Sequence, residues 1–170
     1  MTSAMPLDDN SPIVSMPKAG DVAHTLKLLL DRPCPVSLRR GVRAGSLHTV
    51  TATFIDSTTE ELAAICSCDM AFAAYSGASI VLVPVNRAKE SIKAGKLTES
   101  LEENAFEVFN ILSTFFNNNP RVHVKLEQMY ASLDELPAEV RKAARKARFQ
   151  LDFTVDIKSY GPGALSFYGI

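Results

Sequence analysis

The segment near the C-terminal end of the chain constrains the fold most strongly. Residues 150–157 alternate between polar and apolar side chains, which is the period of a half-buried β-strand. The turn-forming residues 160–163 (Tyr-Gly-Pro-Gly) follow, and a second strand is predicted over residues 164–168. Two strands joined by so short a turn run antiparallel, which excludes a doubly wound parallel sheet.

The rest of the chain is a mixture of expected strands and helices. Further strands are predicted over residues 35–39, 49–55, 79–85 and 122–127. Helices are predicted from Asp21 to Pro33 and over residues 56–76, 88–94, 97–118 and 137–148. The stretch from Gly41 to Gly45 favours a second hairpin between the first two strands. The expected fold class is α+β, with an antiparallel β-sheet of about six strands and long helices packed against it.

Length, charge and hydropathy limit the classes of function. A chain of 170 residues suits one domain: residues 1–20, with three prolines, are expected to be a flexible N-terminal segment, and residues 21–170 a single domain. The formal net charge of −1 argues against broad binding of nucleic acid. No apolar run approaches the ~20 residues that cross a bilayer, and no secretory signal is recognised. A cytoplasmic protein without a membrane partner is therefore expected.

Metal chemistry is not expected from the cysteine and histidine positions. A structural zinc site needs about four ligands at recognisable spacing. The chain has an odd number of cysteines, and its three histidines are scattered away from them. We interpret the cysteines as small buried apolar residues, and we expect no metal site. These residues are Cys34, Cys66 and Cys68, with His24, His48 and His123.

The long helix predicted over residues 97–118 has an apolar face and, opposite it, an unusual polar face. The polar face consists of Glu103, Glu107, Asn110, Thr114 and Asn117. Most such faces are simply solvated, and that interpretation stays open. However, Glu103 and Glu107 are like charges one turn apart, and Asn110 is a poor helix former. This locally unfavourable combination favours a functional role for the face.

Residues 103–110 (Glu-Asn-Ala-Phe-Glu-Val-Phe-Asn) resemble the signature of the CheC/CheX family of chemotaxis phosphatases. That signature has an acidic or serine residue, three positions, Glu, two positions and Asn on a long surface helix. The resemblance extends weakly from about Leu38 to the C-terminal end, and the motif occurs once, as in the CheX branch. It implies a CheC-like fold, an antiparallel sheet with long helices, and a response-regulator receiver domain as the partner.

The same resemblance implies roles for four side chains. Glu107 and Asn110 would be the catalytic pair that reaches into the phosphorylated receiver, and Glu103 and Thr114 would dock the partner. The amide of Asn110 would hold the water that attacks the aspartyl phosphate, and Glu107 would pair with a lysine of the partner. Magnesium would be supplied by the partner's acidic site, so no cofactor bound by this chain is expected.

Three other interpretations of the sequence stay open. Arg39, Arg40 and Arg43 resemble the arginine motif of cyclic-dinucleotide-binding PilZ domains, although an ordinary solvated loop is the simpler interpretation. The basic stretch 141–146 is suited to an acidic partner or to a solvated helix face. The third interpretation is a non-catalytic signalling scaffold, with a homodimer formed through sheet edges.

Overall fold

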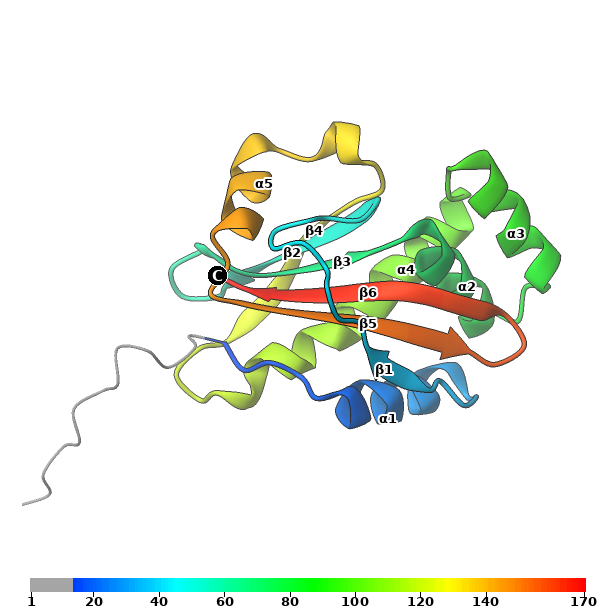
Figure 1. Cartoon of the computed structure of the whole chain (residues 1–170), viewed down its shortest axis with the longest axis horizontal. Helices are drawn as coiled ribbons and strands as arrows, with labels where there is room; N and C mark the ends of the chain where they lie inside the picture. The colour runs from blue at the N-terminus through cyan, green and yellow to red at the C-terminus, as the bar shows by residue number, and fades with distance from the viewer. Residues whose placement is uncertain (1–13) are drawn as a thin grey trace, which may run out of the picture.

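A six-stranded antiparallel sheet lies at the centre of the computed structural model, which describes residues 14–170 (Figure 1). The strand order is β1-β5-β6-β3-β2-β4, so β1 and β4 form the two edges. Five α-helices accompany the sheet within the described residues. The α+β class expected from the sequence is confirmed, including the sheet of six antiparallel strands.

The strands and helices have the following bounds. The strands are β1 (Val36–Leu38), β2 (Val50–Asp56), β3 (Leu62–Cys68), β4 (Val124–Tyr130), β5 (Phe149–Ile157) and β6 (Gly161–Gly169). The α-helices are α1 (Ala19–Leu30), α2 (Met70–Ile80), α3 (Val85–Ala94), α4 (Glu99–Leu112) and α5 (Ala138–Arg145). Two short 3₁₀ helices are η1 (Ser113–Asn118) and η2 (Leu133–Glu135).

The two faces of the sheet are covered by different elements. On one face, helices α1, α2 and α4 enclose the main core, in which the Phe167 ring meets Phe153 and Phe116 edge-on at centroid distances of 5.8 and 6.0 Å. Side chains alternate along a strand, so Ile65 and Tyr168 point to the opposite face. There they pack in a smaller apolar cluster with α5.

Helix α2 is buried along almost its whole length, and its small residues set the position of α4. A Cβ added at Gly77 would lie 2.8 Å from the carbonyl oxygen of Leu101 in α4. The two helix backbones therefore approach as closely as they do because position 77 has no side chain. This contact fixes α4 against the core, with its other face directed outward.

The expected helix over residues 56–76 is wrong in its first half. The carboxylate of Asp56 accepts hydrogen bonds from the amides of Thr58 and Thr59 at 2.7 and 3.3 Å, which closes a tight turn between β2 and β3. The helix begins only at Met70, where the Asp69 carboxylate caps it by accepting from Phe72 N at 2.8 Å. Strand β3 is buried on both faces, so it lacks the alternation that identifies a strand.

Two further sequence expectations are wrong. Residues 79–85 form no strand, because α2 ends at Ile80 and α3 begins at Val85. The stretch from Gly41 to Gly45 is not the turn of a hairpin, because β1 pairs with β5 while β2 lies between β3 and β4. By contrast, the β5–β6 hairpin is confirmed, and the expected long helix is present as α4 continued by η1.

The expected flexible segment, residues 1–20, is described only in part. Residues 1–13 lie outside the described residues. Val14 is buried in the core, and the hydroxyl of Ser15 donates to the Phe115 carbonyl at 2.5 Å and accepts from Asn118 N at 3.1 Å. These contacts attach the segment that precedes α1 to the end of η1. Among the described residues, no helix combines the length and the apolar character needed to cross a membrane.

Candidate functional site

Helix α4 is built as a rigid support for its exposed face. The hydroxyl of Thr98 caps it by accepting from Leu101 N at 3.2 Å, and two glutamates in the first turn lie at the positive end of the helix dipole. Leu101, Ala105, Val108 and Leu112 are buried on the core side. The geometry of the opposite face is therefore determined by well-packed backbone.

The four site residues expected from the sequence all lie on that outer face. Glu103, Glu107, Asn110 and Thr114 are exposed. The side chains of Glu107 and Asn110 have no hydrogen-bond or ion-pair partner within residues 14–170. Thr114 differs, because its hydroxyl donates to the Ile111 carbonyl at 2.9 Å. One turn separates a free carboxylate from a free carboxamide on a fixed helix.

Asn117, the last member of the polar face, has a structural role instead. Its side-chain amide donates to the carbonyl of Val124 at 3.0 Å, and its side-chain oxygen accepts from Val124 N at 2.7 Å. These two bonds attach η1 to the first residue of β4. The end of the long helix is thereby held against the edge of the sheet.

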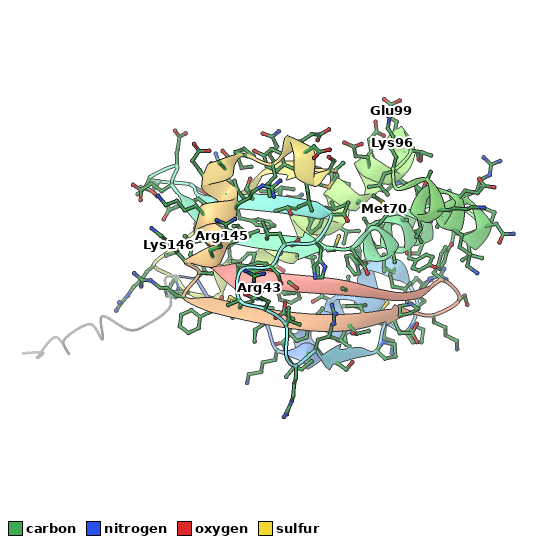
Figure 2. All side chains as sticks on the ribbon, turned by 45° about the horizontal axis from the view of Figure 1, so that its top comes forward. Arg43, Met70, Lys96, Glu99, Arg145 and Lys146 are labelled. Carbon is green, nitrogen blue, oxygen red and sulfur yellow. The ribbon has the colours of Figure 1, made fainter. Side chains whose placement is uncertain are left out.

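A groove of about 850 Å³ runs between the first half of α4 and the edge strand β4. Glu103 and Glu107 line this groove, whereas Asn110 and Thr114 lie beyond its end. Five glutamates and a single lysine line it, so the groove is strongly acidic. Its lining residues are Lys96, Leu97, Glu99, Glu102, Glu103, Asn104, Phe106, Glu107, Glu127, Gln128 and Met129. Figure 2 shows Lys96 and Glu99 together at the N-terminal end of α4.

Sequence reasoning missed the wall of the groove that β4 provides. Glu127 faces the groove, and its carboxylate accepts a hydrogen bond from the Thr53 hydroxyl of β2 at 3.0 Å. Met129 and Phe106 add apolar surface from the two sides. The alternation of residues 122–127 identified a strand, but it contained no signal that this strand would be an edge beside α4.

The described residues do not assemble a metal-binding cluster. No group of three or more histidine, cysteine, aspartate or glutamate side chains is placed to hold an ion within residues 14–170. The three cysteines are free and buried, as the sequence predicted. Burial raises the pKa of the Cys34 thiol to about 11, and it also raises the pKa of Cys66 and Cys68. The thiols are therefore protonated near neutral pH and are poor ligands or nucleophiles.

The arginines of the expected cyclic-dinucleotide motif do not converge on one hollow. Arg39 borders a shallow hollow together with His48 and Asp69. Arg43 borders a different hollow, which it shares with residues of α5. Arg40 is exposed and lines neither of the two.

Comparisons with solved structures place the chain in a known fold. The middle domain of FliM from Vibrio alginolyticus matches 88% of this chain and 86% of its own, with a TM-score of 0.57 and 10% identity. FliM in the FliM–SpeE complex from H. pylori matches 89% of this chain and 80% of its own, with a TM-score of 0.57 and 10% identity.

A structure of the CheX–CheY complex from Borrelia burgdorferi matches 85% of this chain and 90% of that one. Its identity is 11% and its TM-score is 0.42, which is too low to establish a shared fold. No protein-family model and no curated protein sequence matches the chain. On its element order, its antiparallel sheet and the FliM matches, the chain is a domain with the CheC-like fold, the fold that the FliM middle domains share.

Proposed function

We propose that the outer face of α4 acts on the receiver domain of a response regulator and promotes hydrolysis of its aspartyl phosphate. The observation that carries the proposal is the pair Glu107 and Asn110, exposed one turn apart and without partners among residues 14–170. Asn110 lies in the last turn of α4, and its free carboxamide gains no contact that would compensate for the low helix propensity of asparagine. Such a residue is expected where function requires it.

In the proposed reaction, Asn110 is the catalytic residue and acts by orientation. Its side-chain amide holds a water molecule in line with the bond between phosphorus and the aspartate oxygen. The water oxygen forms the new bond to phosphorus as the bond to the carboxylate breaks, so inorganic phosphate and a free aspartate are produced. The water proton passes to the phosphate or to solvent. Magnesium in the receiver's acidic site would offset the charge of the phosphoryl oxygens.

Glu107 and the acidic groove are proposed to position the partner. A lysine of the receiver would pair with Glu107, and this contact sets the register in which Asn110 meets the phosphate. Glu103 would extend the acidic surface along the groove, and Thr114 would border the contact at the other side of Asn110. Because Glu107 lines the groove while Asn110 lies just outside it, docking and catalysis use adjacent parts of one helix.

The test is the release of inorganic phosphate from receiver domains phosphorylated with acetyl phosphate. We expect the full chain to accelerate release from a cognate receiver. We expect Asn110→Ala to abolish the acceleration and to leave binding of the receiver unchanged. Glu107→Ala should instead weaken binding, since it removes the docking charge. Asn86→Ala, at an exposed asparagine of α3, is the matched control and should behave like the native chain.

Absence of acceleration with every receiver tested would refute the catalytic proposal. Equal activity of the Asn110→Ala variant and the native chain would refute the role of that residue. Because Asn110 is exposed, circular dichroism of the variant is expected to match the native spectrum, and loss of activity then reports on chemistry rather than folding.

A non-catalytic binding module is the second candidate, because one of the similar FliM structures is a complex of FliM with SpeE. In that case the α4–β4 groove would hold a protein partner without turnover. This function would be identified if the chain binds a receiver without changing its rate of phosphate release. Binding should then be lost in Glu107→Ala and kept in Asn110→Ala. A homodimer through the β4 edge is a related proposal, and light scattering of the full chain tests it.

A further inference from the structure

The structure brings together two basic segments that are about 100 positions apart in the sequence. Arg43, from the loop between β1 and β2, and Arg141 and Arg145, from α5, line one hollow of about 370 Å³. Figure 2 shows Arg43 close to Arg145 at the end of α5. Residues 44–47 and Leu133 complete the lining, so the hollow contains no carboxylate.

The loop that carries Arg43 is held firmly on the sheet. The side-chain oxygen of Gln150 accepts from Gly45 N at 2.8 Å, and its side-chain amide donates to the Arg43 carbonyl at 3.3 Å. The same carbonyl accepts from the amide and the hydroxyl of Ser46, and the Tyr168 hydroxyl donates to the Ser46 carbonyl. The backbone beneath Arg43 is therefore fixed before any ligand arrives.

The loop also lies directly on α5. A Cβ added at Gly45 would lie 2.6 Å from the Cα of Arg145, and Gly45 has a φ of +75°. Only glycine permits both the backbone conformation and this approach. Gly45 thus brings Arg43 beside Arg145 without an intervening side chain.

Two of the three guanidinium groups are free to bind a ligand. The Arg141 side chain donates to the Leu133 carbonyl and is half-buried, which orients it along the wall of the hollow. Within residues 14–170, the exposed side chains of Arg43 and Arg145 have no hydrogen-bond or ion-pair partner. Converging cations without a carboxylate repel one another, and a bound anion would relieve this repulsion.

We propose that this hollow binds a small molecule that carries two phosphate groups, with Arg43 and Arg145 each holding one of them. The planar guanidinium donates two parallel hydrogen bonds to phosphate oxygens. The volume lies at the lower end of the range of ligand sites, roughly 300–1,000 Å³, and therefore fits a compact diphosphate better than a macromolecule. The site is separate from the outer face of α4 and does not depend on the receiver reaction.

The test is calorimetric titration of the full chain with pyrophosphate, ADP and cyclic diguanylate. We expect pyrophosphate or ADP to bind, and we expect Arg43→Gln and Arg145→Gln each to weaken binding about tenfold or more, because each removes a charged two-point contact. Arg43→Lys keeps the charge but loses the fork, so its affinity should fall between those of the native chain and Arg43→Gln.

The matched controls are Arg40→Gln in the same loop and Lys142→Gln on α5, since both residues are exposed and neither lines the hollow. They should keep affinities within about twofold of the native value. The proposal is overturned if none of the three probes binds, or if the controls weaken binding as much as Arg43→Gln does. It is also overturned if cyclic diguanylate alone binds and depends on Arg39 and Arg40 rather than on Arg145.

Discussion

The α4–β4 groove and the hollow between the 43–47 loop and α5 are opposite in charge and in construction. The groove has five glutamates and one lysine along a helix and a sheet edge, whereas the hollow has three arginines and no carboxylate. The formal net charge of −1 for the whole chain conceals this separation. Near-neutral composition therefore argues against a uniformly basic surface but says nothing about local anion sites.

The two regions also differ in what holds their side chains in place. In the groove, the rigidity comes from apolar packing of α4 on α2, and the free side chains project from a fixed helix. In the hollow, the rigidity comes from hydrogen bonds of Gln150 and Tyr168 to loop backbone. A helix face suits a large flat partner, and an anchored loop suits a small ligand that needs converging donors.

The largest expected effect is on the proposed reaction of the α4 face. Asn110→Ala should abolish the acceleration of receiver dephosphorylation, a loss of about 100-fold in rate, because water loses its orientation in line with the phosphate. Phosphate release under single-turnover conditions measures this effect. Pyrophosphate affinity of the same variant should be unchanged, and a parallel loss of both properties would show that the two regions are not independent.

A substitution at Gly45 should disrupt the hollow and leave the groove intact. Gly45→Ala forces a Cβ against the Cα of Arg145 at a φ of +75°, so we expect a loss of about 2 kcal/mol in the free energy of unfolding. Urea denaturation measures the loss, and calorimetry with pyrophosphate should detect no binding. Gly41→Ala is the control for positive φ, since an added Cβ there meets no atom within 4 Å.

A substitution at Gly77 is the corresponding test of the groove. Gly77→Ala places a Cβ 2.8 Å from the Leu101 carbonyl oxygen and displaces α4, but alanine also favours the helix. We expect a net loss of about 1 kcal/mol in urea denaturation, with weaker receiver binding. Retained receiver binding together with weaker pyrophosphate binding would contradict the assignment of the two regions.

The smallest expected effect is a pH dependence of the loop that ends at His48. Burial lowers the pKa of His48 below its ordinary value of 6.5; nearby Arg39 acts in the same direction, and Asp69 and Asp152 act against it. At pH values between the lowered pKa of the folded chain and 6.5, His48 binds more protons in the unfolded chain than in the folded chain. The free energy of unfolding therefore falls as the pH falls through this window. Urea denaturation at several pH values measures the slope.

Replacement of the imidazole provides the control for that slope. In the His48→Gln variant, the part of the pH dependence of the unfolding free energy that His48 contributes should vanish. Hydrogen exchange should locate the native acid effect in residues 43–48, because His48 N donates to the Ser67 hydroxyl at 2.7 Å and its Nε2 lies 3.3 Å from the Ser166 hydroxyl. If lowering the pH accelerates hydrogen exchange in α4 as much as in residues 43–48, the acid effect is not confined to the loop.

The prediction of one helix over residues 56–76 fails because strand β3 and helix α2 are buried on all sides. Strand β3 and helix α2 are both rich in small apolar residues, and almost every position of either is covered. Without a solvent-facing side, neither the strand period nor the helix period is visible in these two elements. The sequence pattern therefore predicts one continuous helix over residues 56–76, which includes the turn after Asp56 and the whole of β3. The half-exposed strand β5 and helix α4 show clear periods, and both predictions are confirmed.

For the candidate site, the sequence indicated the face of α4 but not its surroundings. Glu103, Glu107, Asn110 and Thr114 share a helix, so their common exposure follows from local spacing. Four of the five groove glutamates lie on α4, whereas Glu127 lies on β4. Glu127 reaches the groove because β4 is the edge strand of the sheet. That position depends on the order of the strands, which is a long-range property.

Local spacing in the sequence thus determined the outer face of α4, the β5–β6 hairpin and the α+β class, because each depends on neighbours within one or two elements. Tertiary structure alone decided which edge strand faces α4 and that Arg43 meets Arg145, because these contacts join segments far apart along the chain. The pairing of β1 with β5 instead of β2 has the same origin. The pairing of strands depends on which arrangement of the sheet buries the most apolar surface, and this surface comes from the whole molecule.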